Sequence, residues 1–290
     1  MKTETLSLNG HPFFIRSWGD PALPPLVLLH GFPEYGGAWE DLVPFLSDRF
    51  YCVAPDLRGY GQSWTPEGVD HYATSEIAGD VAALIGHLGR GPVTVLGHDW
   101  GASVAYALAL FVPDVVEKLI ILNGVHPMPF IREVSAGGAQ SAASQYMNML
   151  RAPGSEDRLA ENDYAKLLGF LSGQLDMRWM TPDRLDTYKA EWSRPGRFKA
   201  MIHWYRASPF RIADPGVPVT DNPQYPREMM MVRCPHLLIW GTGDTALLEV
   251  STEGLEDYAP DLTRVTLDDA DHWLHHQKPA EVAEAILNWV

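Results

Sequence analysis

Hydrophobic and polar positions follow two different periods along this chain. Short apolar runs, each followed by polar or turn-forming residues, recur at 26–29, 51–54, 93–96, 119–122, 237–240 and 263–267. Between several of them apolar positions are spaced three and four apart, as at 38–46 and at 75–88, where Ser75 is the expected N-cap. Buried strands that alternate with helices predict βαβ units, and hence a mostly parallel central sheet with helices on both faces.

A polar dipeptide breaks the alternating segment at the start of the chain. Residues 5–18 alternate between apolar and polar side chains, and Asn9-Gly10 interrupts them. Asn-Gly between two such runs is a strong signal for a two-residue β-hairpin. The chain is therefore expected to begin with a hairpin.

The alternation of strands and helices fails between residues 127 and 226. This stretch is rich in Met, Trp and Tyr, and helical spacing appears at 140–151, 163–172, 183–192 and 198–206. Five prolines between 209 and 226 indicate an extended return to the sheet near Cys234. We therefore predict an α/β core of residues 1–126 and 227–290, and an inserted all-helical cap (lid) domain of residues 127–226.

One strand-to-helix junction carries a recognisable turn. Gly97-His98-Asp99-Trp100-Gly101 joins an apolar strand to a helix of small residues. The pattern is that of a nucleophile elbow, with aspartate where serine is usual. Glycines on both sides leave room for a tight turn, and the free N–H groups of the following helix keep the carboxylate ionised. A purely structural turn with an acidic residue at the start of the helix has the same pattern. Whether Asp99 is a nucleophile therefore depends on other residues of the chain.

Polar residues also follow the other predicted strands, at the edge where open α/β sheets bind ligands. They are His30, Asp56, Asn123, Asp244 and the pair Asp271-His272. Asp99, Asp244 and His272 then stand in the order nucleophile, acid, base. The separation between the last two leaves room for one helix and one strand. We therefore expect their side chains on adjacent loops at the same edge of the sheet.

Two other aspartates compete with Asp244 for the role of acid. Asp268 and Asp269 are nearer to the base in sequence, but they lie at the end of the predicted strand itself. Asp244 has an alternative of its own, because it is also placed to cap a helix that starts near Leu247. We rank Asp244 first as the acid.

Three histidines occur close together near the C-terminal end of the chain. His272, His275 and His276 have helical spacing and lie beside several aspartates, which is one pattern of metal ligands. No two-histidine helix motif with a positioned glutamate accompanies them. We therefore expect no metal and no cofactor, and we place His275 and His276 at the surface.

The motifs together resemble a known family. They are His30-Gly31-Phe32-Pro33-Glu34, Asp56-Leu57-Arg58-Gly59-Tyr60-Gly61-Gln62-Ser63, Gly97-His98-Asp99-Trp100-Gly101-Ala102, the Gly241–Asp244 turn and Asp271-His272-Trp273. The chain resembles the α/β-hydrolase superfamily, in its epoxide hydrolase and haloalkane dehalogenase branch, and is closest to soluble epoxide hydrolases. The resemblance implies the α/β-hydrolase fold, with Asp99 as nucleophile, His272 as base and Asp244 as its orienting acid. It also implies an oxyanion hole formed by the backbone N–H groups of Phe32 and Trp100.

The aspartate changes the expected chemistry. A carboxylate can displace a leaving group at a saturated carbon and form an alkyl-enzyme ester on Asp99. Water activated by His272 then hydrolyses that ester, and the oxyanion hole stabilises the tetrahedral intermediate. A serine at position 99 would instead react with esters, so an esterase or lipase is disfavoured.

Two tyrosines of the predicted cap help to identify the leaving group. The opened epoxide needs a proton donor, and the resemblance implies two cap tyrosines for that role. Tyr205, within His203-Trp204-Tyr205-Arg206, matches one of them. The other is expected just before Pro153-Gly154, where Met149 holds the usual position and Tyr146 lies one helical turn earlier. Both tyrosines have packing in the cap as their alternative role.

A halide leaves without a proton but needs N–H donors. Trp100 offers one, yet haloalkane dehalogenases usually have asparagine where this chain has Phe32. Haloacid dehalogenases usually have arginine where it has Trp100. The sequence therefore favours a cofactor-independent epoxide hydrolase that forms vicinal diols. The alternatives are a haloalkane or haloacid dehalogenase with the same triad, and a non-catalytic protein that binds a small ligand.

Apolar residues in or near the cap are candidates for the lining of the substrate pocket. We select Trp100, Phe130, Met149, Trp204 and Trp273. Packing within the cap is the alternative for several of them.

Composition restricts the partners. The 290 residues carry a net charge of −15, which disfavours nucleic acid and anionic membranes. Two isolated cysteines, Cys52 and Cys234, fit a reducing cytoplasm. We find neither an apolar leader nor an 18-residue apolar run, so we expect a soluble cytoplasmic protein. Its expected partners are a small apolar epoxide and water, and it is expected to be a monomer or a homodimer.

Overall fold

An eight-stranded sheet runs through the computed structural model, which describes residues 1–290. Its strands, in the order β1-β2-β4-β3-β5-β6-β7-β8, are β1 (Lys2–Leu8), β2 (His11–Trp18), β3 (Pro25–Leu29), β4 (Tyr51–Pro55), β5 (Val93–His98), β6 (Val116–Leu122), β7 (His236–Gly241) and β8 (Leu262–Leu267). The six strands from β3 to β8 are parallel to one another, and β2 alone runs in the opposite direction, antiparallel to its neighbours β1 and β4. The predicted mostly parallel sheet is therefore confirmed.

The predicted hairpin is present at the start of the chain. Asn9-Gly10 joins β1 to β2, with Leu8 paired to His11. Both turn residues have positive φ, 52° for Asn9 and 82° for Gly10, as a two-residue hairpin turn that matches the strand twist requires.

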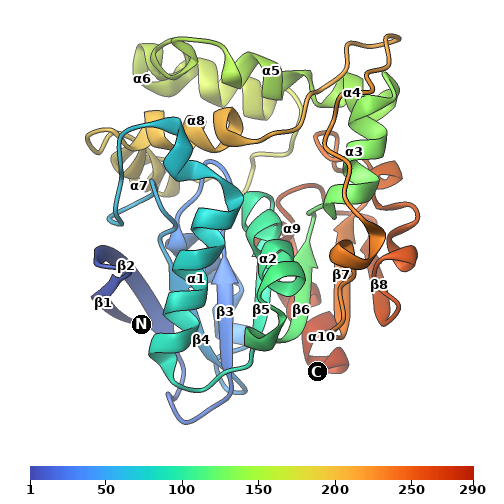
Figure 1. The fold of residues 1–290 in the computed structure, drawn as a ribbon. Helices are drawn as coiled ribbons and strands as arrows, with labels where there is room; N and C mark the ends of the chain where they lie inside the picture. The colour runs from blue at the N-terminus through green and yellow to red at the C-terminus, as the bar shows by residue number, and fades with distance from the viewer.

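Helices cover both faces of the sheet, as predicted. Along β3, Val27 and Leu29 pack on the face covered by α1 (Thr74–Leu88) and α2 (Trp100–Phe111), which lie in front of the sheet in Figure 1. Leu26 and Leu28 point to the other face, which is covered by α10 (Pro279–Trp289). Because strand side chains alternate between faces, a strand buried on both sides must be wholly apolar.

Six helices lie between β6 and β7, and we call residues 127–226 the helical segment. They are α3 (Pro127–Ser135), α4 (Ala139–Ala143), α5 (Gln145–Arg151), α6 (Ser155–Ser172), α7 (Pro182–Trp192) and α8 (Arg197–Ala207). Figure 1 shows α5, α6 and α8 across the end of the sheet toward which the arrow of β3 points. Residues 208–226 return without a helix or strand apart from one bridge between Asp214 and Val217. The division into core and cap domains stays a prediction.

Local details differ from the sequence-based expectations. Residues 38–46 form two 3₁₀ turns, η1 (Gly36–Asp41) and η2 (Val43–Phe45), because Pro44 starts a new turn. Ser75 is not an N-cap: α1 begins at Thr74, its N-cap position is the extended Ala73, and no side chain caps it. None of the helices combines the length and apolar composition needed to cross a bilayer.

Two buried histidines make the fold sensitive to acid. Burial lowers the pKa of His126 to about 4 and that of His236 to about 3. His126 precedes α3 and accepts the Met128 N–H, while His236 on β7 lies 3.3 Å from the Tyr106 hydroxyl. Both rings are therefore neutral in the folded protein at pH values where they would be protonated in the unfolded chain.

We expect the free energy of unfolding to decrease as the pH falls from 6.5 toward these folded pKa values. In that window the unfolded state binds protons that the folded state excludes, so each histidine removes up to about 1.4 kcal/mol per pH unit. Urea unfolding at pH 7 and pH 5 measures the loss. His236→Asn keeps a hydrogen-bonding side chain but does not titrate, and should reduce the slope by about one proton. An unchanged slope would contradict the assignment.

Candidate active site

The turn between β5 and α2 holds Asp99 in a strained conformation. Its φ is 51° and its ψ is −119°, a region that residues other than glycine rarely adopt. Close approach explains the flanking glycines: a Cβ at Gly97 would lie 2.4 Å from the Gly101 oxygen, and one at Gly101 would lie 2.0 Å from the Leu29 oxygen. Only glycine fits at either position, and the turn presents the carboxylate at the edge of the sheet.

The Asp99 carboxylate has one donor and one histidine beside it. The Phe32 backbone N–H donates to Oδ1 over 2.7 Å, and the His272 Nε2 lies 3.7 Å from Oδ2. A Cβ at Gly31 would lie 2.4 Å from Oδ1, so the loop after β3 can approach this closely only with glycine. The N–H of Trp100, in the first turn of α2, has no acceptor in its own helix.

His272 and Asp244 form a buried pair. The His272 Nδ1 lies 2.8 Å from the Asp244 Oδ2, and Asp244 is 5% exposed. Backbone N–H groups of Ala246 and Leu247 donate to its Oδ1, and the Asn123 amide donates to its Oδ2 over 2.8 Å. Burial opposes ionisation of this carboxyl, but His272 and these donors outweigh it and lower its pKa. Asp244 thus contacts the histidine, and it also accepts N–H groups as a cap would.

The His272 imidazole carries a raised pKa. Burial disfavours its charged form, but the charge and hydrogen bond of Asp244 and the charge of Asp99 outweigh burial and raise the pKa to about 9. At neutral pH the ring is therefore an imidazolium beside two carboxylates. Any reaction that removes the charge of Asp99 lowers this pKa and lets the ring accept a proton.

The other two aspartates near the strand end do not join this group. Asp268 and Asp269 are both exposed.

Asn123 belongs to the group around His272 and Asp244, although the sequence assigned it no role. Its φ is 32°, and its Oδ1 accepts the Gly241 N–H over 2.7 Å. Its position directly after β6 was the available signal.

Tyr146 and Tyr205 lie together above Asp99. Their ring centroids are 6.3 Å apart, and the Tyr205 ring stands edge-on to the rings of Phe32 and Trp100 at 5.2 and 5.1 Å. Burial, followed by the charge of Asp99, raises the pKa of each tyrosine well above 10. Both therefore keep their phenolic protons and can donate them.

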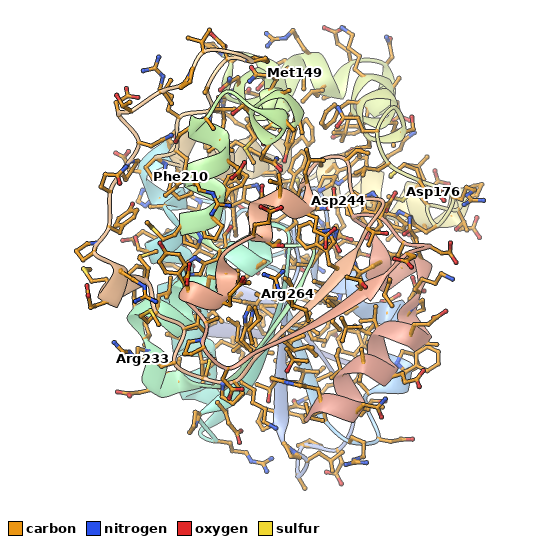
Figure 2. All side chains as sticks on the ribbon, turned by 90° about the vertical axis from the view of Figure 1, so that its right-hand side faces the viewer. Met149, Asp176, Phe210, Arg233, Asp244 and Arg264 are labelled. Carbon is orange, nitrogen blue, oxygen red and sulfur yellow. The ribbon has the colours of Figure 1, made fainter.

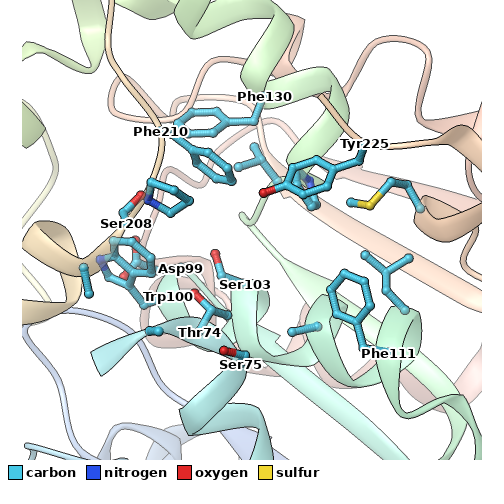
Figure 3. A pocket seen from close by; sticks show the side chains of 18 of the residues that line it. Thr74, Ser75, Asp99, Trp100, Ser103, Phe111, Phe130, Ser208, Phe210 and Tyr225 are labelled. Atoms are coloured by element: carbon cyan, nitrogen blue, oxygen red, sulfur yellow. The ribbon is translucent and has the colours of Figure 1, made fainter. Parts of the chain in front are cut away.

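Two cavities meet at Asp99. The smaller has a volume of about 30 Å³, and its wall includes Phe32, Tyr146, Tyr205, His272 and Trp273. The larger has a volume of about 390 Å³, and its wall includes Trp100, Ser103, Phe130, Phe210 and Tyr225. Figure 3 shows the larger cavity, with the side chains of Asp99 and Trp100 at one end and Phe111 at the other.

Two of the expected pocket residues lie elsewhere. Met149 is 41% exposed, and Figure 2 shows it at the outer edge of the helical segment, away from Asp244. Trp204 is buried, but its indole N–H donates to the Arg58 carbonyl over 3.0 Å and it lines neither cavity. Met147, two residues before Met149, does line the larger cavity. The rotation of α5 about its axis determines whether Met147 or Met149 faces the cavity, and the sequence did not predict that rotation.

A buried polar cluster lies behind His272. Glu34 has His276 Nε2 at 2.8 Å, His98 Nδ1 at 3.2 Å and His275 Nε2 at 3.4 Å, and it accepts the Tyr188 hydroxyl over 3.2 Å. The expectation that His275 and His276 lie at the surface is therefore wrong. They are 0% and 9% exposed, because the short helix α9 (Leu274–Gln277) turns them toward a carboxylate far away in the sequence.

The same cluster contains the residues best placed to hold a metal ion. One ligand atom each from Glu34, His98 and His275 lies within 4.8 Å of the others. Hydrogen bonds within the cluster already engage the Glu34 oxygens. The opposite nitrogen of His98 lies 2.8 Å from the His272 carbonyl oxygen, so the cluster supports the backbone of the histidine beside Asp99.

Comparisons with known proteins agree with this architecture. A model of the alpha/beta hydrolase fold family matches residues 24–279. A Bacillus subtilis protein of the AB hydrolase superfamily is 32% identical over the whole chain and 98% of its own length. Mouse epoxide hydrolase 4 is 28% identical over 93% of this chain and 74% of its own length.

Solved structures of epoxide hydrolases are also similar. A structure described under novel epoxide hydrolases from metagenomes of hot environments has a TM-score of 0.91 and 32% identity, and covers 99% of this chain and 98% of its own. The Bacillus megaterium epoxide hydrolase in complex with an inhibitor has a TM-score of 0.87 and 27% identity, and covers 99% of each chain.

Proposed function

This chain belongs to the alpha/beta hydrolase fold family, and from that premise we propose that it is an epoxide hydrolase that converts apolar epoxides into vicinal diols. The observation that carries the proposal is a carboxylate, rather than a hydroxyl, at the turn after β5, with His272 3.7 Å away and two phenols above it. Its similarity to proteins named epoxide hydrolases supports the same activity.

In the first step Asp99 opens the epoxide. A carboxylate oxygen of Asp99 attacks one ring carbon, the bond between that carbon and the ring oxygen breaks, and an ester forms. The ring oxygen takes a proton from Tyr205 or Tyr146, which line the smaller cavity with Asp99. Proton transfer of this kind typically contributes about 10²- to 10⁴-fold to the rate.

In the second step water hydrolyses the ester. Esterification removes the charge of Asp99, so the pKa of His272 falls from about 9, and the imidazolium passes its proton through water to the phenolate left by the first step. The neutral ring is now a base. It takes a proton from water, whose oxygen adds to the Asp99 carboxyl carbon, and the Phe32 and Trp100 N–H groups stabilise the oxyanion. The bond to the alkyl oxygen then breaks, and His272 protonates that oxygen. The Asp99 carboxyl group that results gives its proton to His272, which restores the carboxylate and the imidazolium.

Turnover of two substrates tests the proposal. The wild-type protein is incubated with styrene oxide and, separately, with 1-bromobutane, and diol and bromide are measured. Diol formation is expected. A haloalkane dehalogenase is the second candidate, because the same triad suits it and Trp100, which lines the larger cavity with Asp99, has an indole N–H. Bromide release without diol formation would establish that candidate instead.

Substitution of Tyr205 and Tyr146 distinguishes an epoxide hydrolase from a haloalkane dehalogenase. Tyr205→Phe is expected to lower kcat for styrene oxide about 10²-fold, because the ring oxygen would leave with one proton donor fewer. Tyr146→Phe should have an effect in the same direction, and the double variant a larger one. Tyr164→Phe is the matched control, since that tyrosine belongs to the helical segment but lines neither cavity. If Tyr205→Phe kept full activity, the proton would have to come from elsewhere.

A further inference from the structure

The two cavities at Asp99 differ more than tenfold in volume, about 390 Å³ against about 30 Å³. A cavity of about 150 Å³ is enough to bind benzene. The larger cavity therefore has room for a two-ring substituent. The smaller one has about a fifth of the volume that binds benzene and therefore has no room for a ring.

The lining of the smaller cavity combines the residues proposed for catalysis with large apolar side chains. Tyr146, Tyr205 and His272 line it together with Asp99. The rest of its lining includes Trp273 and four residues at the end of α6 and just after it, Phe170, Leu171, Gln174 and Leu175. This space suits the ring oxygen of an epoxide and the water of the second step, and it leaves no place for a second bulky group.

The larger cavity has the properties of a site for an apolar substituent. Leu110, Phe130, Met147 and Phe210 contribute to an apolar wall, and single hydroxyls such as that of Ser103 interrupt it. The cavity runs from Asp99 toward Phe111, which is 54% exposed, so its far end reaches the surface of the protein (Figure 3). A long substituent can therefore extend toward solvent without displacing the wall.

We propose that the substrates are terminal epoxides with a single large and mainly apolar substituent, which occupies the larger cavity while the unsubstituted side of the ring faces the smaller one. The inference rests on the proposed function and specifies its substrate class. Epoxides with a bulky group on each carbon are excluded, because one of the two groups would have to enter a cavity that is too small for a ring.

A matched pair of substrates tests the inference. Styrene oxide carries one phenyl group, and trans-stilbene oxide carries one on each carbon. We expect kcat/KM for styrene oxide to exceed that for trans-stilbene oxide by at least about 100-fold, since a ring misplaced from the reactive geometry costs that much. Equal values for the two epoxides would overturn the inference.

Two variants change the cavities in opposite directions. Ala107 lies on α2 in the wall of the larger cavity, one turn after Ser103, and Ala107→Phe fills it. The ratio of kcat/KM for styrene oxide to that for propylene oxide should fall at least about tenfold. Leu175→Ala enlarges the smaller cavity and should raise kcat/KM for trans-stilbene oxide by a similar factor. We choose Leu175 because Phe170 packs on Tyr146, with ring centroids 5.7 Å apart.

Controls distinguish failure of this inference from failure of the proposed function. Phe45→Ala removes an exposed aromatic residue that lines neither cavity and should leave both ratios unchanged. His272→Gln is exposed to propylene oxide and weighed by intact mass spectrometry. An adduct together with ratios that none of the cavity variants changes would reject the substrate class alone. No adduct and no turnover with any of the three epoxides would reject both proposals.

Discussion

Asp99→Ala is expected to abolish diol formation, with kcat for styrene oxide lower by roughly 10⁵-fold or more. The substitution removes the only group that the proposed mechanism uses to attack the ring carbon. The residual donors, Tyr205 and the Phe32 N–H, cannot open the ring without a nucleophile. Product formation is measured by chromatography over hours, so that even a slow reaction is detected.

The fold should survive this substitution. Asp99 accepts one backbone N–H and is not part of the apolar core, so circular dichroism should show an unchanged spectrum and cooperative melting. Asp269→Ala is the matched control, because it removes an exposed carboxylate near the same edge of the sheet. A variant that is folded and retains more than a tenth of the activity would refute Asp99 as the nucleophile.

His272→Gln is expected to stop the reaction after its first step. Without a base the ester on Asp99 is not hydrolysed, so the protein should make one equivalent of adduct and then no diol. Intact mass spectrometry should show the mass of one whole styrene oxide molecule added to the chain. With 1-bromobutane, addition of the butyl group alone would indicate halide displacement instead.

Two further variants locate the adduct and isolate the role of the base. Asp99→Ala combined with His272→Gln should show no adduct, because the attacking carboxylate is gone. His87→Gln, at an exposed histidine in the last turn of α1, should turn over normally. Steady diol production by His272→Gln at the wild-type rate would contradict the assignment of His272 as the base.

The strands of this fold could be predicted because a strand that is buried on both faces is made of apolar residues, and such a run is visible in the sequence. β3 and β7 are buried on both faces, and apart from His236 at the start of β7 they contain only apolar residues and glycine. The turn at Asp99 was equally visible, since two close backbone approaches require the glycines on either side. Chain order then placed Asp244 and His272 at the same edge, where the structure brings them within 2.8 Å.

Features that depend on distant partners could not be predicted in the same way. His275 and His276 have the polarity of surface residues, and only the approach of Glu34, more than two hundred residues earlier, explains their burial. Met149 holds the expected sequence position for a pocket residue, but the short helix α5 turns Tyr146 and Met147 inward instead. The spacing of apolar residues identifies the apolar face of a helix, but tertiary packing determines the direction in which that face points.

The helical segment leaves the sheet at β6 and returns at β7, and these two strands are direct neighbours, with Leu119 paired to His236 and Leu122 to Ile239. An exchange of genetic material between those two points would therefore break no strand pairing. It would leave Asp99, Asp244 and His272 where they are and replace both phenols together with much of the larger cavity. Recombination at these two junctions would thus replace, in a single event, the part of both cavity linings that the helical segment contributes, while the residues around Asp99 in the core stay the same.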